Sequence, residues 1–95
     1  MASMFIRHHV ADFAQWKLAF HEHETARRRA GFTAHSLYRE ADDPNVVIIS
    51  FTVSDLNRAK EFAGSRDLRS VMERAGVQGP PDIWFAESVE EKRYQ

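Results

Sequence analysis

The chain has 95 residues, of which 43% are hydrophobic and 28% charged, and its formal net charge is −1 at pH 7. This near-neutral charge argues against nucleic-acid and membrane-surface binding, which need an excess of basic residues. The absence of cysteine excludes disulfides, thiolate nucleophiles and cysteine metal ligands.

The first predicted elements are a strand over Met4–Val10 and a helix that follows it. The strand is short and rich in residues that favour β structure. Asp12 is a typical N-cap residue, and Gln15 three positions later completes a capping-box pattern. We expect the helix to run to about Ala30, where Gly31 supplies the C-terminal stop.

The rest of the chain predicts three more strands and a second helical region. We expect a strand over Phe32–Glu40, a turn over Ala41–Asn45 and a strand over Val46–Val53. Two helices should follow, the first capped by Ser54 or Asp55 and the second capped by Ser65 and ended by Gly76. After a break at Gly79–Pro81, the last strand should cover Asp82–Val89.

The order β-α-β-β-α-β predicts an α+β fold of the ferredoxin-like type. In this sandwich, helices cover one face of a four-stranded antiparallel sheet. We expect one domain over residues 1–95, with an ordered core over 4–89 and a polar tail over 90–95. No segment resembles a signal peptide or an apolar span of about 20 residues, so we expect a cytoplasmic protein.

The predicted sheet is apolar on both faces. In the third strand, Val47, Ile49 and Phe51 belong to one face, while Val46 and Ile48 belong to the other. Helices can cover only one face, and large exposed apolar patches are uncommon. We therefore predict a homodimer in which a partner's sheet covers the second face; the alternative is a monomer with a moderately apolar open face.

The segment FHEHETARRR, which begins at Phe20, contains a His-Glu-His-Glu run that looks like a metal site. On a helix, however, His21 and His23 lie about 200° apart and cannot hold one ion. The helical wheel places His23 in the buried stripe with Arg27 one turn later. The other members of that stripe are Phe13, Trp16, Ala19, Phe20, Ala26 and Ala30.

Two interpretations of His23 and Arg27 remain open at this point. In one, His23 is a core histidine bonded to a backbone carbonyl, and the Arg27 head group reaches water. In the other, both side chains line an apolar pocket between helix and sheet, which is the usual setting of a small-molecule site.

Other side chains could join such a pocket. His8 lies on the first strand and His35 on the second, although alternation alone does not decide whether His8 or His9 faces the helices. Three converging histidines would suit a metal, but no local spacing supports one, so we predict no metal site. The candidate lining residues are Trp16, Phe20, Arg27, Tyr38, Phe51 and Trp84.

The chain resembles a known superfamily, the dimeric α/β barrels, and within it the antibiotic-biosynthesis monooxygenases and related small bacterial proteins, some of them called cyclases. The resemblance covers about Phe5 to Glu87 and is carried by RHHVADFAQWKLAFHEHETARRRAGF, YREADDPNVVIISFTVSDLNRAKEF and LRSVMERAGVQGPPDIWF. The positions that match the look of this group are His8, Asp12, Trp16, Phe20, His23, Arg28 and the Asp43-Pro44-Asn45 turn. It implies a ferredoxin-like protomer that closes a barrel with its partner.

The resemblance also implies an activity. Members of the superfamily include enzymes that oxidise aromatic polyketides without metal or flavin, so we expect no cofactor. His23 would be the general base or hydrogen-bond donor, and His8 or His35 would assist it. Arg28 matches the group, but Arg27 lies on the buried stripe and is the better binding candidate.

Three functions follow as hypotheses. The first is cofactor-independent oxygenation or cyclisation of an aromatic, polyketide-like substrate. The second is a non-catalytic homodimer that binds an apolar or aromatic small molecule. The third is a haem-binding protein with His23 or His35 as axial ligand, which would need a large cavity.

Overall fold

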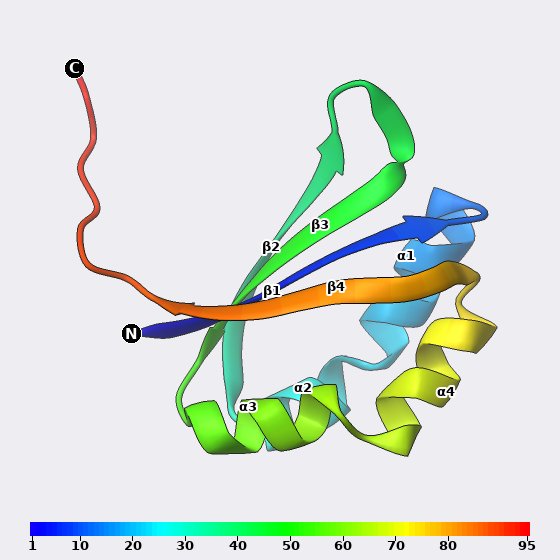
Figure 1. Ribbon diagram of the computed structural model, residues 1–95, viewed down its shortest axis with the longest axis horizontal. Coiled ribbons are helices and arrows are strands. Elements are labelled where there is room, and N and C mark those ends of the chain that lie inside the picture. The colour runs from blue at the N-terminus through cyan, green and yellow to red at the C-terminus, as the bar shows by residue number, and fades with distance from the viewer.

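The computed structural model describes residues 1–95 and has four helices on one face of a four-stranded antiparallel sheet (Figure 1). The elements are β1 (Ala2–Val10), α1 (Phe13–Glu22), α2 (Glu24–Arg29), β2 (Phe32–Glu40), β3 (Asp43–Val53), α3 (Leu56–Ala63), α4 (Arg66–Arg74) and β4 (Val77–Glu87). The strand order β2-β3-β1-β4 confirms the predicted ferredoxin-like sandwich. None of the helices is long and apolar enough to cross a membrane.

Local signals in the sequence fix the starts of three helices. The Asp12 carboxylate accepts a hydrogen bond from the Gln15 N–H at 3.1 Å, as the capping-box pattern predicts. Of the two candidates before α3, Asp55 is the cap. Ser65 caps α4 by accepting from the Leu68 N–H at 3.2 Å. These side chains satisfy amide groups that the first helical turn leaves free.

The core lies between the helices and the inner face of the sheet. On β1 and β3, alternate residues face the helices and are almost fully buried. The register pairs Met4 with Phe51 and Ile6 with Ile49, so these apolar side chains form adjacent rows. Alternation then places His8 among them, 3% exposed, while His9 lies on the other face and is exposed. The choice between the two histidines is thereby settled.

The prediction of one continuous helix to Ala30 was wrong, because the helix breaks at His23. His23 has φ −90° and ψ 4°, outside the helical range, and its N–H is shared between the carbonyls of Ala19 and Phe20. The chain resumes as α2 at Glu24. Arg27, which the helical wheel placed on the buried stripe, lies in α2 and is buried.

Several strand boundaries also differ from the prediction: β1 begins at Ala2 and β4 ends at Glu87, each two residues before the predicted position. The turn between β2 and β3 is shorter than predicted: β3 begins at Asp43, whose carboxylate accepts from the Asn45 N–H at 3.0 Å. β4 begins at Val77 and continues through Gly79–Pro81, the predicted break. Proline is tolerated there because β4 is an edge strand and because the register shifts at this point, forming a bulge.

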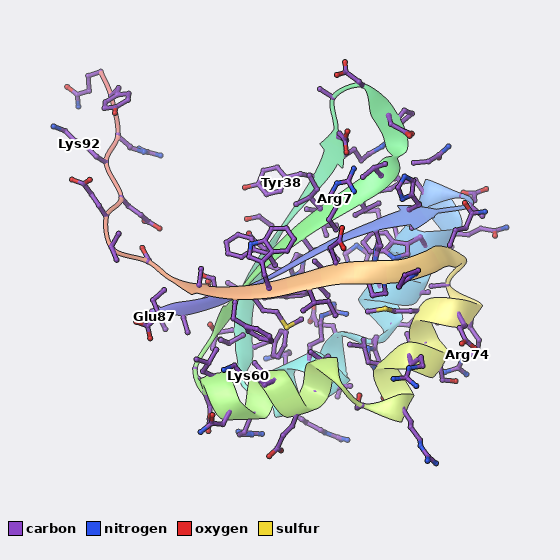
Figure 2. All side chains as sticks on the ribbon, viewed as in Figure 1. Arg7, Tyr38, Lys60, Arg74, Glu87 and Lys92 are labelled. Atoms are coloured by element: carbon purple, nitrogen blue, oxygen red, sulfur yellow. The ribbon has the colours of Figure 1, made fainter.

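The second face of the sheet is open and carries both apolar and charged side chains. Phe5 and Trp84 stack with ring centroids 5.5 Å apart, and Trp84 is 44% exposed. Arg7 donates to the Glu40 carboxylate at 2.9 Å. Tyr38, paired with Ile48 across the strands, is 56% exposed and points away from the helices (Figure 2). This face is therefore less uniformly apolar than the sequence suggested.

Gly31 provides a test of the connection between α2 and β2. It has φ +89°, and a Cβ there would lie 2.7 Å from the Ser54 hydroxyl oxygen. We expect Gly31→Ala to lower the free energy of unfolding by about 1–3 kcal/mol, measured by urea titration. Gly64→Ala is the matched control, because Gly64 has negative φ and a Cβ there would meet nothing closer than 3.7 Å. Equal stability of the two variants would contradict this account.

Candidate small-molecule site

Arg27 lies buried beneath the end of α1, in agreement with its place on the predicted buried stripe. Arg27 is 5% exposed, and its Nη1 donates to the Phe20 carbonyl oxygen at 2.8 Å. That carbonyl belongs to the last turn of α1, where the helix dipole favours a cation. The guanidinium carbon also lies 3.7 Å from the centroid of the Phe20 ring and 5.9 Å from that of Phe51. Arg27 therefore contacts both the end of α1, at Phe20, and the sheet, at Phe51.

Burial lowers the pKa of Arg27 to about 10, an effect that nearby Glu24 partly opposes. The group therefore remains cationic at neutral pH. Its Nη2 is buried and has no hydrogen-bond partner. A buried charge with a free donor is unusual, because unpaired polar atoms inside a protein are destabilising. Arg27 can accordingly donate to a bound oxygen or anion without breaking an existing bond.

A groove of about 700 Å³ opens beside Arg27, between α2 and the start of β2. This volume falls within the range of small-molecule sites. The lining residues are Glu24, Arg27, Arg28, Phe32, Thr33, Ala34, His35 and Phe51. The groove therefore combines an aromatic floor with cations and one imidazole.

His35 brings the imidazole to this groove. Its ring meets the Phe20 ring edge-on, with centroids 5.0 Å apart, so His35 and Arg27 contact the same aromatic side chain. Burial lowers the pKa of His35, and the positive charges of Arg27 and His21 lower it further, against a smaller opposing effect of Glu24. At neutral pH the imidazole is therefore uncharged and has a nitrogen that can accept a proton.

A second space of about 40 Å³, called the inner cavity below, lies between the helices and the sheet. It is lined by Met4, Ile6, His8, Trp16, Phe20, His23, Arg27, Ile49, Phe51, Phe62, Leu68, Val71, Met72 and Ala75. Most of these side chains are apolar. Arg27 and Phe51 line both this cavity and the groove, so they form the wall between the two spaces.

His8 is the most buried polar group of the inner cavity. Neither of its ring nitrogens has a hydrogen-bond partner, and its nearest aromatic neighbour is Trp16, edge-on at 5.5 Å. Burial, with a smaller contribution from the charge of His9, lowers the pKa of His8 to about 4. The ring is therefore neutral under ordinary conditions, with one N–H donor and one acceptor nitrogen.

His23 lies at the helix break and has a partner of its own. Its Nε2 is 3.1 Å from the Asp67 carboxylate in α4, and its ring stacks against Phe62 of α3 at 5.7 Å. Neither interpretation from the sequence described this contact, because the predicted partners were a backbone carbonyl or a ligand. His23 therefore links the junction of α1 and α2 to the second pair of helices.

Solved structures share this architecture. A protein from Bordetella bronchiseptica, provisionally assigned as an antibiotic biosynthesis monooxygenase, superimposes with a TM-score of 0.78 at 15% identity, covering 94% of this chain and 97% of its own. SnoaB, a cofactor-independent oxygenase from Streptomyces nogalater, gives 0.69 at 18% identity, covering 96% and 97%. Rv0793 from Mycobacterium tuberculosis gives 0.68 at 13% identity, covering 97% and 98%.

This chain has the antibiotic biosynthesis monooxygenase fold. The structural likeness agrees with the resemblance seen in the sequence. With the sequence itself, no family model matches and no curated protein is significantly similar. At 13–18% identity, these structural matches establish the shared fold alone. The chemistry has to be argued from the side chains of this chain.

The antibiotic biosynthesis monooxygenase fold gathers most of the predicted site residues and separates others. His8, Trp16, Phe20, His23, Arg27 and Phe51 surround the inner cavity, and His35 lies across Arg27 and Phe51 in the groove. Tyr38 and Trp84 do not join them, because strand alternation places both on the open face. No group of three His, Asp or Glu side chains is arranged to hold a metal ion.

Sequence reasoning missed the part of the groove around the connection between α2 and β2. Glu24 and Thr33 line it, yet neither was predicted as a site residue. A signal was present: Gly31 forces a tight turn, so residues shortly before and after it must face one another. Asp67, the partner of His23, had no such signal, because a carboxylate in the first turn of a helix is common for helix stability alone.

The depressed pKa of His8 makes stability depend on pH. The unfolded chain binds a proton at His8 below about pH 6.5, whereas the folded chain does so only near pH 4. Stability is therefore lost as the pH falls through this window, by up to about 3 kcal/mol. We expect His8→Phe to reduce this loss in urea titrations between pH 7 and 4. His9→Asn, on the exposed face, should retain it, and identical pH slopes in all three proteins would refute the assignment.

Proposed function

We propose that this protein is a small-molecule enzyme that performs cofactor-independent oxygenation or cyclisation of an aromatic, polyketide-like substrate in the groove. The observation that carries the proposal is the convergence of neutral His35 and cationic Arg27 on Phe51, which lines the groove with both of them. The likeness of the fold to SnoaB, a cofactor-independent oxygenase, supports the same class of chemistry.

The two polar groups suit the activation of a phenol. An aromatic ring packs against Phe51, and His35 accepts the phenolic proton, because its lowered pKa keeps it neutral and ready at neutral pH. The Arg27 guanidinium lines the groove, and its positive charge stabilises the resulting phenolate. An electron-rich phenolate can then react with dioxygen or attack a carbonyl carbon of the same molecule.

The three predicted catalytic histidines take different roles in this proposal. His35 is the base because it alone lines the groove. His23 was the first choice from the sequence, but its Nε2 is occupied by Asp67, so we assign it a positioning role at the helix break. His8 is buried in the inner cavity and does not line the groove that would hold the ring.

We also propose that the protein acts as a homodimer through the open sheet face. The stacked Phe5–Trp84 pair and Tyr38 leave aromatic surface uncovered there, and Arg7 and Glu40 provide a charged pair beside it. A partner's copy of the same face would cover this surface in a closed two-fold arrangement.

Turnover tests the role of His35. With a panel of naphthols and anthrones as substrates, we expect oxygen consumption with product formation, and His35→Ala should lower kcat by about 10²–10⁴-fold. His9→Ala is the matched control, because His9 lies on the opposite face of the sheet. Full activity of folded His35→Ala would contradict the proposal. Thermal stabilisation by these compounds without any product would instead identify a non-catalytic binding protein.

Light scattering tests the dimer. At micromolar concentration we expect a mass of about twice the 11.0 kDa of one chain. Trp84→Arg should yield a monomer, since it places a charge in the centre of the proposed interface. Leu18→Arg, at a residue 67% exposed on α1, should leave the dimer intact. A wild-type mass of a single chain would refute this arrangement.

A further inference from the structure

We propose that the inner cavity beneath His8 is a binding site for dioxygen, an inference that rests on the oxygenase function proposed above. At about 40 Å³, it is far smaller than the cavity of about 150 Å³ that accepts benzene in an engineered protein. It therefore cannot hold an aromatic substrate. Its lining is mostly aliphatic and aromatic, which suits a small apolar molecule.

The polar atoms in the lining suit the reduced form of that molecule. One nitrogen of neutral His8 carries a hydrogen, and Nη2 of Arg27 carries two, and none of these donors has a partner. Dioxygen itself gains little from them. Superoxide is an anion, and the unpaired donors and the positive charge of these two lining residues would favour it over dioxygen. Such preorganised donors stabilise a charge that develops during a reaction.

The two spaces share a wall, which places the cavity next to a ring bound in the groove. Arg27 and Phe51 line both the groove and the cavity, so a ring in the groove and dioxygen in the cavity would be separated only by these side chains. Arg27 can therefore contact the phenolate on one side and the reduced oxygen on the other. This arrangement keeps the two reactants close without requiring the small cavity to admit the ring.

Dioxygen is the only oxidant in the proposed oxidation of the phenolate. The phenolate transfers one electron to dioxygen, which gives a phenoxyl radical and superoxide. Superoxide then passes Arg27 into the groove, where the two radicals combine to form a carbon–oxygen bond at a ring carbon, and the resulting peroxide anion takes back the proton held by His35. Loss of water from this hydroperoxide, with the hydrogen of the same carbon, leaves a quinone. His8 donates a hydrogen bond to superoxide while it is in the cavity and transfers no proton.

Dissolved dioxygen itself is the probe, because it is paramagnetic and accelerates the relaxation of nearby nuclei. Under oxygen pressure, we expect methyl signals of Met4 and Ile49, which line the cavity, to relax several-fold faster than those of Val10 and Val53. All four residues are at most 2% exposed, so depth of burial does not explain a difference. Equal relaxation at all four would overturn the proposal, as would a long-lived water detected beside the His8 ring.

A variant whose cavity is filled by a larger side chain tests the same site. Ala75→Val adds two methyl groups to the lining and should abolish the excess relaxation, raise the KM for dioxygen and leave binding of naphthols in the groove unchanged. Val71→Leu, at another lining residue, is the alternative cavity-filling variant if Ala75→Val does not fold. Preferential relaxation without turnover would uphold the oxygen site and refute the oxygenase function. Turnover without preferential relaxation, or an unchanged KM for dioxygen in the filled variant, would refute the oxygen site alone.

Discussion

The constraint on which the site depends is the burial of the Arg27 guanidinium beneath the end of α1. A buried cation is destabilising unless it is compensated, and here the Phe20 carbonyl and the faces of two aromatic rings compensate it. The helix breaks four residues earlier, at His23, whose Nε2 contacts the Asp67 carboxylate of α4. One charged group thus fixes the relation between the helix layer and the sheet.

Arg27 also divides the interior into two chemically different spaces. The groove on one side is wide, partly polar and open to a ring-sized molecule, and His35 stands in it with a neutral imidazole. The cavity on the other side is small and apolar, and His8 stands in it with two unpaired nitrogens. In the proposed reaction each reactant is held in the environment that suits it, the anionic ring beside polar groups and the apolar gas among apolar side chains.

Much of the fold could be predicted from the sequence, because its signals are local. The caps at Asp12 and Ser65 and the stop at Gly31 mark element ends without reference to distant residues. The helix break at His23 has no proline or glycine to signal it, and the contact of His23 with Asp67 joins residues 44 positions apart. The site was predictable as a set of residues on inward faces, but the assignment of His35 to the groove and His23 to a carboxylate required the relative placement of helices and sheet.

The most direct test of the account is the ionisation of a naphthol bound to the protein, followed by its ultraviolet absorbance as the pH is varied. Arg27 beside the groove should stabilise the naphtholate, so the pKa of the bound naphthol should lie below that of the free compound, and Arg27→Met should remove the difference. A bound naphthol whose pKa is unchanged or raised would contradict the central claim that this buried cation is placed to hold a phenolate.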